Sequence, residues 1–264
     1  MMLADALAIK DREVISLVGG GGKTTLMFAL GRELSCRKKG VILTTTTKIW
    51  EPTPSPALAL FLSDQISEVG KWIMKSLELY PYLVIATERL AHGKLQGVPP
   101  SWVEEMVSLP GVSVIIVEAD GAAGRSLKAP RAGEPVLPPN TTLLVPVVGI
   151  DVLGCPLDEE HVFRSEIVAR SLNTPKGTAV TQEMIAGLLP EIIKGRPEEA
   201  RVIPFINKID LPGSLEKGRE LAKVFLSIRQ VKIERVILGQ AQNSFVVKEI
   251  VWPSQPPLAL TIQT

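Results

Sequence analysis

Short runs of apolar and β-branched residues alternate along the chain with longer segments in which apolar residues recur every three or four positions. Such short runs are typical of buried strands, and the longer segments are typical of helices that pack one face on a sheet. The strand-like runs cover 13–18, 41–46, 83–87, 112–118, 142–148, 201–206 and 233–238. The clearest helical segments cover 24–36, 64–77 and 214–228, and a Pro-Pro start signal precedes a further one at 100–108. The alternation predicts an α/β fold with a mostly parallel sheet and helices on both faces.

Prolines mark the interruptions of this pattern. They cluster at 52–56, 135–139 and 252–257, where we expect loops rather than core elements. The segment 149–200 is less regular and could form a small irregular or helical lobe. Because a chain of 264 residues can bury a sizeable core, we predict a single α/β domain over 1–264 that carries this lobe.

A glycine-rich turn joins the first strand to the first helix. Backbone N–H groups in such a turn point at a bound phosphate, and the helix N-terminus adds partial positive charge. Lys23 can then reach the β- and γ-phosphates, and the Thr24 hydroxyl can bind Mg²⁺. The match to G-x-x-x-x-G-K-[ST] is incomplete because Leu17 stands where the first glycine belongs, so we interpret the turn as a variant phosphate-binding loop. The residues of this loop are Gly19, Gly20, Gly21, Gly22, Lys23, Thr24 and Thr25.

Two other interpretations of the turn are weaker. The glycines could simply pack a helix on a strand and leave Lys23 in solvent. A dinucleotide-binding turn would need its third glycine where Thr24 stands, and an acid after the second strand, where the chain has Thr44 to Thr47. We therefore predict a P-loop NTPase-like fold that binds GTP or ATP.

Two carboxylates, Glu118 and Asp120, follow the apolar run at 114–117. Ligands of open α/β sheets bind beyond the carboxyl ends of the strands, so either carboxylate can hold Mg²⁺ or orient an attacking water. Glu118 and Gly121 also have the spacing of the D-x-x-G element of GTP-binding domains, with Glu in place of Asp. We predict Thr24, Glu118 and Asp120 as metal ligands and Lys23, Glu118 and Asp120 as catalytic residues; the alternative is a solvated strand end.

The run at 202–206 ends in Asn207, Lys208, Ile209 and Asp210, which has the N-K-x-D pattern that reads guanine. In that pattern the aspartate accepts from the N1 and N2 hydrogens of guanine, the asparagine braces the loop, and the lysine stem covers the ring. Backbone N–H groups at 239–241, after the next strand, could meet the guanine O6. We predict Asn207, Lys208 and Asp210 as base-binding residues; an ordinary strand-to-helix turn is the alternative.

Three further segments carry hydroxyl or cationic side chains that could bind a second substrate. The threonine run before Lys48 ends the strand that we expect beside the phosphate-binding loop, although β-propensity and helix capping also explain it. The loop after Asp120 could close on an anion or hold its cations in solvent. His161 and Arg164 would share a face if helical, and the alternative is a packed or solvent-facing histidine. The candidates are Thr46, Thr47, Lys48, Arg125, Lys128, His161 and Arg164.

Composition excludes several classes of function. A formal net charge of +1 gives no electrostatic reason to expect nucleic acid or an anionic membrane as partner. No apolar stretch reaches membrane-spanning length, and the N-terminus lacks a secretion signal, so we expect a cytoplasmic protein. Two cysteines and two histidines lie scattered without ligand spacing, which favours Mg²⁺ held by oxygen over a Cys/His metal site.

Four segments taken together resemble one family: Gly-Gly-Gly-Gly-Lys-Thr-Thr at 19–25, Leu-Thr-Thr-Thr-Thr-Lys-Ile-Trp at 43–50, the segment from Val117 to Pro130, and Asn-Lys-Ile-Asp at 207–210. The chain resembles the YqeC family of selenium cofactor biosynthesis proteins, accessory factors of selenium-dependent molybdenum hydroxylases. His161-x-x-Arg164 also fits the family's pattern. The threonine run and Glu-Ala-Asp-Gly are the distinctive segments of this set.

The resemblance implies a bacterial cytoplasmic protein that helps to install a labile selenium centre in a hydroxylase, with that hydroxylase or its cofactor as a partner. The residues themselves predict only a nucleotide site. Three functions stay open at this point: a Mg²⁺-dependent GTPase or ATPase that drives maturation, a transferase or ligase that acts on a small acceptor, and a non-catalytic nucleotide switch.

Overall fold

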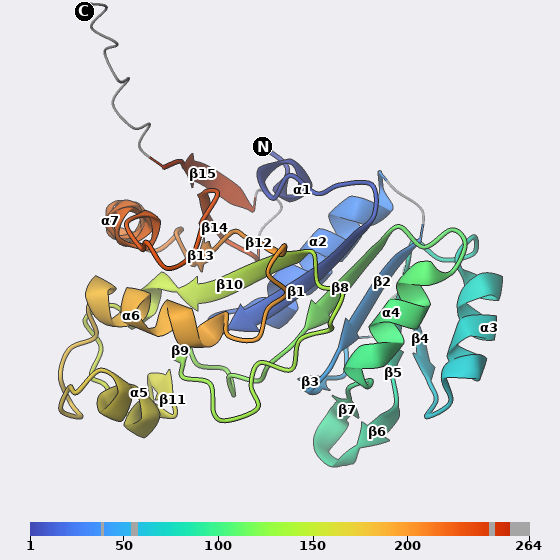
Figure 1. Ribbon diagram of the computed structural model, residues 1–264, viewed down its shortest axis with the longest axis horizontal. Coiled ribbons are helices and arrows are strands. Elements are labelled where there is room, and N and C mark those ends of the chain that lie inside the picture. Colours follow the sequence, from blue (N-terminus) through green and yellow to red (C-terminus); the bar gives the residue numbers. More distant parts are fainter. Residues whose placement is uncertain (38–39, 54–57, 243–245, 254–264) are drawn as a thin grey trace, which may run out of the picture.

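The computed structural model describes residues 1–37, 40–53, 58–242 and 246–253. A large twisted sheet runs through the molecule, and helices cover both of its faces (Figure 1). Its strand order is β15-β14-β13-β10-β1-β8-β2-β5-β4, with β12 beside β10. All neighbouring strands are parallel except β14 and β15, so the predicted mostly parallel α/β fold is confirmed.

The bounds of the large sheet's strands follow the apolar runs of the sequence closely. All of these strands fall on runs that the sequence predicts except β4, at one edge of the sheet, and β15, at the other. The strands are β1 (Glu13–Gly19), β2 (Val41–Thr45), β4 (Leu58–Leu62), β5 (Tyr82–Ala86), β8 (Val114–Glu118), β10 (Leu143–Gly149), β12 (Arg201–Val202), β13 (Phe205–Asn207), β14 (Val236–Gly239) and β15 (Val247–Val251).

Alternation along the central strand β1 explains the layers. Ile15 and Leu17 point to one face and join a hydrophobic cluster with α1 (Leu3–Ala6) and α2 (Lys23–Ser35). Val14 and Val18 point to the opposite face, which is covered by α3 (Ile66–Ser76), α4 (Pro100–Ser108), α6 (Gln182–Ile192) and α7 (Ser214–Leu226). Every residue of β1 is buried, as expected for a parallel strand covered on both faces.

Two details of the sheet differ from the prediction. The run at 201–206 is not one strand: it divides into β12 and β13 at Ile203 and Pro204, because proline has no N–H to donate to a neighbouring strand. The strand that carries the threonine run was expected beside the phosphate-binding loop, but β8 lies between β1 and β2. The acidic strand, rather than the threonine strand, is therefore the direct neighbour of β1.

The less regular segment 149–200 contains η2 (Ile150–Val152), β11 (Val162–Phe163), α5 (Ser165–Ser171) and α6. Leu188 and Leu189 of α6 share a hydrophobic cluster with Val148 of β10 and Ile206 of β13. This helix therefore packs directly on the large sheet. β11 pairs with β9 (Leu127–Lys128) in a separate two-stranded sheet.

A three-stranded antiparallel sheet, which the sequence pattern did not predict, lies below the large sheet in Figure 1. It consists of β3 (Lys48–Trp50), β7 (Lys94–Gln96) and β6 (Glu88–Leu90), with η1 (Ala91–Gly93) between the last two. Of the proline clusters, 135–139 forms a loop as expected, while 54–56 and 254–257 lie outside the described residues.

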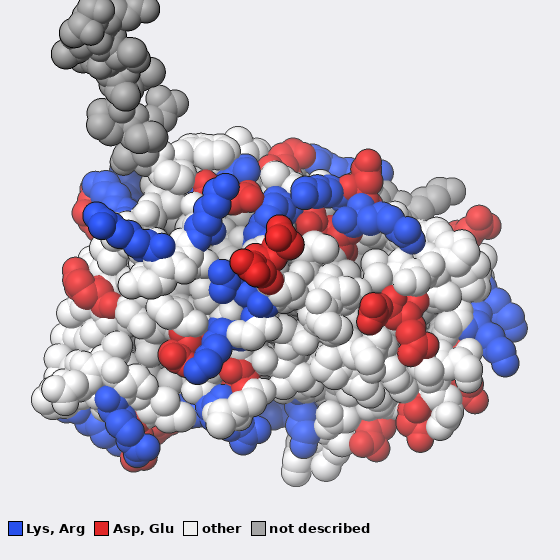
Figure 2. Space-filling model, viewed as in Figure 1, with Lys and Arg blue, Asp and Glu red and all other residues white. Residues whose placement is uncertain are grey.

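The described helices include none that is both long and apolar enough to cross a membrane. On the face drawn in Figure 2, both basic and acidic side chains are present, and broad uncharged areas separate them.

Candidate functional site

A cleft of about 760 Å³ opens where the carboxyl ends of β1, β8 and β2 meet. This is the edge at which ligands of parallel α/β sheets bind. One wall is the glycine-rich loop and the start of α2, and a second wall is the loop after β8. A third wall is formed by the small sheet of β3 and β7.

The glycines of the loop are required by conformation and by crowding. Gly19, Gly21 and Gly22 have φ of 91°, 78° and 116°, a region that favours glycine. A Cβ atom on Gly21 would lie 2.2 Å from the backbone nitrogen of Gly149, and one on Gly22 would lie 2.5 Å from Asn207 Nδ2. Larger residues would therefore push the loop away from β10 and β13.

The start of α2 offers unpaired N–H donors to the cleft. Within the described chain, the N–H groups of Gly22, Lys23, Thr24 and Thr25 have no backbone or side-chain acceptor. The first N–H groups of any helix lack an intrahelical partner, and here they lie beside a cleft rather than beneath a capping side chain. Such a group of donors is suited to a phosphate.

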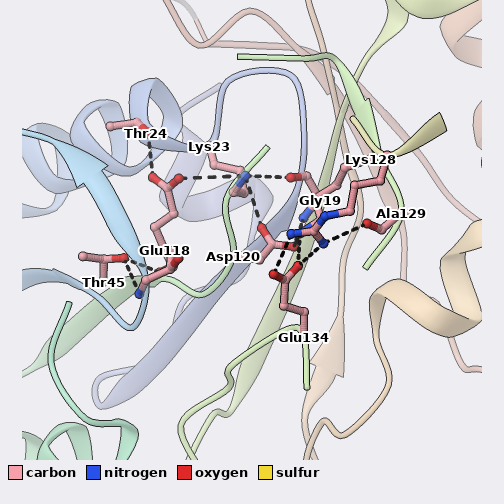
Figure 3. Close-up of polar contacts among 11 residues, drawn as sticks. Gly19, Lys23, Thr24, Thr45, Glu118, Asp120, Lys128, Ala129 and Glu134 are labelled. Carbon is pink, nitrogen blue, oxygen red and sulfur yellow. Dashed lines mark hydrogen bonds and ion pairs between the residues drawn. The ribbon is translucent and has the colours of Figure 1, made fainter. Parts of the chain in front are cut away.

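Lys23 lies between the loop and the two carboxylates that the sequence singled out (Figure 3). Its Nζ donates to Gly19 O at 2.6 Å, and it is 3.2 Å from Asp120 Oδ1 and 3.8 Å from Glu118 Oε1. Asp120 Oδ2 accepts from the Gly19 N–H at 3.0 Å. The three predicted catalytic side chains are thus brought together, and all are buried.

Beside Lys23, side-chain oxygens of Thr24, Glu118 and Asp120 form a set of ligand atoms that fits Mg²⁺. The Thr24 hydroxyl donates to Glu118 Oε2 at 2.6 Å, and Asp120 Oδ1 makes no hydrogen bond within the described residues. The part of the chain that the structure describes has no group of three His, Cys, Asp or Glu residues arranged around a metal position. Such a sparse set suits Mg²⁺, which commonly takes one or two carboxylates and completes its shell with phosphate and water.

Burial affects the ionisation of Glu118. Removal from solvent raises its pKa above the ordinary value, against the lowering effect of the Lys23 charge and the Thr24 hydrogen bond. The carboxylate is therefore held at an energetic cost, which a nearby cation would reduce.

A second cluster of charges lies next to Asp120. Lys128 is fully buried on β9, and its Nζ is 3.1 Å from Asp120 Oδ2 and 2.7 Å from Glu134 Oε2. Arg164 binds the same Glu134 through two hydrogen bonds of 2.7 and 2.9 Å. Burial alone would raise the pKa of Glu134, but the hydrogen bonds from Arg164 and Lys128 lower it to about 2. This cluster connects the loop after β8 to the start of α5.

The cationic candidates for a second substrate are therefore divided between two environments. Lys128 holds the cluster together and does not line the cleft, whereas Arg125 and Arg164 do. Arg125 donates to the backbone oxygens of Ala123 and Glu159 and forms no ion pair within the described residues.

His161 lies outside the cleft, and its Nδ1 is 2.8 Å from Asp158 Oδ1. The helical spacing that would have aligned it with Arg164 is absent, because Val162–Phe163 forms β11 and Arg164 has φ of 62°. The two side chains therefore have different partners.

Most hydroxyls of the threonine run have structural partners. Thr44 and Thr45 are buried and donate to Ile85 O and Glu118 O, and Thr46 donates to Val136 O at 2.6 Å. Thr46, Thr47 and Lys48 all line the cleft. The run thus joins β2 to its neighbours and ends at the cleft wall.

The predicted base-binding residues lie on the other side of β1. Asn207 donates from Nδ2 to Gly21 O at 2.6 Å and accepts at Oδ1 from the Ala241 N–H at 2.8 Å, so it braces the loop as the pattern requires. Lys208 pairs with Asp151 at 2.7 Å, and Asp210 is exposed. The N–H groups of Gln240 and Ala241, predicted to meet a guanine O6, already donate within the chain.

Comparison with known proteins adds to this geometry. The family model described as YqeC protein matches residues 15–166. A protein of Escherichia coli (strain K12), described as uncharacterized protein YqeC, is 30% identical over 245 residues, which cover 92% of this chain and 93% of the relative. The chain belongs to the YqeC family.

The YqeC match at 15–166 includes the glycine-rich loop, both carboxylates and the Glu134–Arg164 pair. Within this YqeC chain, sequence reasoning missed Glu134, Trp50 and Lys94. Glu134 belongs to no recognisable sequence motif. Its place in the charged cluster depends on hydrogen bonds from Lys128 and Arg164, which lie 6 and 30 residues away. Trp50 and Lys94 meet only because β3 pairs with β7, a pairing that no local pattern indicates.

Proposed function

We propose that this protein binds a nucleoside triphosphate with Mg²⁺ at the glycine-rich loop and acts as a GTPase or ATPase. The observation that supports the proposal most directly is the group of unpaired N–H donors at Gly22 to Thr25, next to the buried Lys23. Donors fixed at a helix N-terminus stabilise phosphate oxygens without reorganising.

Each residue has a distinct role in this proposal. Lys23 exchanges its contact with Gly19 O for the β- and γ-phosphates and neutralises charge that develops on transfer. Thr24 and Glu118 hold the metal, and Asp120 orients the attacking water through its oxygen that lacks a hydrogen bond. Bound Mg²⁺ would supply further charge neutralisation at the phosphates.

The base is assigned to the side of Asn207, Lys208 and Asp210. Asn207 contacts both the phosphate-binding loop and the strand end at Ala241, so a base bound there has a fixed position relative to the phosphates. We propose guanine as the preferred base because Asp210 is exposed and has the position that the N-K-x-D pattern requires. ATP is the alternative, and the calorimetric titration described below compares the affinities for GTP and ATP.

The cellular role in the proposal comes from family membership. We propose that the protein is a cytoplasmic accessory factor that uses nucleotide in the maturation of selenium-dependent molybdenum hydroxylases, with the hydroxylase or its cofactor as a partner. A non-catalytic nucleotide switch and a transferase acting on a small acceptor would use the same loop. Turnover that requires an added acceptor would favour the transferase.

Calorimetric titration tests the nucleotide site. The wild type, Lys23→Ala and the control Lys71→Ala, an exposed lysine on α3, are titrated with GTP, ATP and their non-hydrolysable analogues, with and without Mg²⁺. We expect Mg²⁺-dependent binding that Lys23→Ala abolishes and Lys71→Ala preserves. Absence of binding in the wild type would refute the NTPase proposal.

The maturation role has a separate test. Cells that carry the Lys23→Ala protein in place of the wild type should yield a hydroxylase with less selenium and unchanged molybdenum. Equal selenium content in the two strains would remove the maturation role and leave the nucleotide site intact.

A further inference from the structure

The strands β3 and β7 of the small sheet turn one face toward the cleft. The pairing of β3 with β7 places Lys48 opposite Gln96, Ile49 opposite Leu95 and Trp50 opposite Lys94. Because side chains alternate along a strand, the first and third pairs share one face and the middle pair shares the other. Ile49 and Leu95 are buried in the main hydrophobic cluster, and the four remaining side chains line the cleft.

This face is fixed relative to the large sheet. The Gly97 N–H donates to Thr47 O at 2.6 Å and the Val98 N–H donates to Thr45 O at 2.8 Å. A Cβ atom on Gly97 would lie 2.4 Å from Thr45 O, so only glycine allows this close approach. The end of β2 therefore holds the small sheet in place.

The strand order indicates where this face lies relative to a nucleotide bound at the glycine-rich loop. β13, which carries Asn207, lies on one side of β1, while β8 and β2 lie on the other. This step rests on the proposed function: a nucleotide with its phosphates on the loop and its base near Asn207 would direct the terminal phosphate toward β8. The cleft continues past that point to Trp50 and Lys94.

The chemistry of the face is aromatic and cationic. Trp50 is 62% exposed, and Lys94 Nζ is 4.9 Å from the centre of its ring. Neither Lys48 nor Lys94 forms an ion pair within the described residues, and Arg125 on the opposite wall contacts only backbone oxygens. An exposed indole stacks on flat rings, and uncompensated cations attract anionic groups.

We propose that the β3–β7 face is a binding site for a second ligand, a planar heteroaromatic molecule that carries at least one anionic group. Trp50 stacks on the ring, and Lys48, Lys94 and Arg125 bind the anionic group. The ligand then lies beside the terminal phosphate of the nucleotide, in the position of an acceptor substrate.

Flavin mononucleotide is a suitable probe because it is planar, anionic and loses fluorescence when it stacks on tryptophan. Riboflavin, which lacks the phosphate, is the matched control ligand. Trp252→Ala is the matched control variant, because Trp252 is also exposed and also contacts a cation, with the guanidinium carbon of Arg235 4.3 Å from the centre of its ring. Trp252 directly follows β15, an edge strand of the large sheet, and does not line the cleft. All titrations contain a saturating non-hydrolysable nucleotide and Mg²⁺, so that the phosphate-binding loop is filled.

We expect saturable quenching of flavin mononucleotide in the wild type and in Trp252→Ala. Its affinity should fall about 10-fold or more in Trp50→Ala and in Lys94→Ala, and riboflavin should bind about 10-fold more weakly. No saturable quenching, or equal affinity in Trp50→Ala, would overturn the proposal. The same titration repeated without nucleotide keeps the two proposals apart: flavin quenching that Trp50→Ala still weakens there would support this site whether or not the glycine-rich loop binds a nucleotide.

Discussion

The hydroxyl of Thr24 lies 2.6 Å from Glu118 Oε2 and joins the first turn of α2 to the end of β8. The two residues are 94 positions apart and meet because β1 and β8 are neighbours in the sheet. A hydroxyl oxygen and a carboxylate oxygen this close together can both bind a single cation at the cleft surface. The contact is thus the observation on which the proposed metal position at this corner of the cleft rests.

Replacing Glu118 tests that assignment. Glu118→Gln keeps the size of the side chain and can still accept from Thr24, but it removes the charge that would hold Mg²⁺. We expect nucleotide affinity in the presence of Mg²⁺ to fall about 10–100-fold, the range typical of altered metal-binding groups, while affinity without Mg²⁺ stays the same or rises. Calorimetry with and without the metal measures both.

The matched control is Glu105→Gln, an exposed residue on α4 without a hydrogen bond or ion pair to another described side chain. It should behave as the wild type in both titrations. An equal Mg²⁺ dependence in the Glu118→Gln protein would show that the metal is held elsewhere.

The local sequence pattern was enough to predict the strand and helix that carry the proposed nucleotide site. The apolar run before Gly19 and the helical pattern after Lys23 predict β1 and α2 within a residue or two. The carboxylates after Val117 could be placed near Lys23 because strands of a parallel sheet end at one edge. These are consequences of hydrophobic periodicity and of one topological rule.

The third wall of the cleft could not be predicted in the same way. Trp50 and Lys94 are far apart in sequence and come together through three-residue strands, which are too short to produce a period-two pattern. Lys128 was equally unpredictable: a lysine after a glycine-containing loop is usually solvated, and only Asp120 and Glu134 make its burial tolerable. The position of Trp50 beside Lys94 and the burial of Lys128 both depend on contacts between residues far apart in the sequence, which local propensities do not report.

Variants at Asn207 and Asp210 test two different roles, bracing of the glycine-rich loop and recognition of the base. Asn207→Ala removes two buried hydrogen bonds, to Gly21 O and from the Ala241 N–H, and we expect it to lower the free energy of unfolding by about 2–4 kcal/mol. Asp210→Ala is at an exposed position and should change stability by less than about 0.5 kcal/mol. Urea unfolding measures both variants.

Asp210→Ala should instead change selectivity. If Asp210 accepts from guanine, its loss lowers affinity for GTP and leaves affinity for ATP unchanged in the same calorimetric titration. An unchanged ratio of GTP to ATP affinity would mean that the N-K-x-D pattern here is only a strand-to-helix turn.

Two glycines give a test of the backbone geometry. Gly21→Ala places a Cβ atom 2.2 Å from a backbone nitrogen at a φ of 78°, so we expect a loss of about 2 kcal/mol or more in the free energy of unfolding. Gly70 lies in α3 with nothing within 4 Å of an added Cβ, and Gly70→Ala should raise stability by about 0.5–1 kcal/mol. Thermal and urea unfolding of the two variants should therefore move in opposite directions.

The Glu134 cluster predicts a specific acid sensitivity. In the folded protein the pKa of Glu134 is about 2, against an ordinary value of 4.5. A carboxylate with a lowered pKa contributes stability above its unfolded pKa and loses that stability as the pH falls toward the folded value. The full difference corresponds to about 3 kcal/mol, and roughly 1.4 kcal/mol of it is lost between pH 6 and pH 3.5.

Glu134→Gln removes this titration. The variant is less stable at pH 6, because Lys128 and Arg164 lose a charged partner, but its stability should fall less than that of the wild type between pH 6 and pH 3.5. The raised pKa of Glu118 acts in the opposite direction and is present in both proteins, so it cancels in the comparison. Urea unfolding at the two pH values, with Glu105→Gln as control, gives the difference; an equal fall in the wild type and in Glu134→Gln would show that the Lys128–Glu134–Arg164 contacts do not depress this carboxyl in solution.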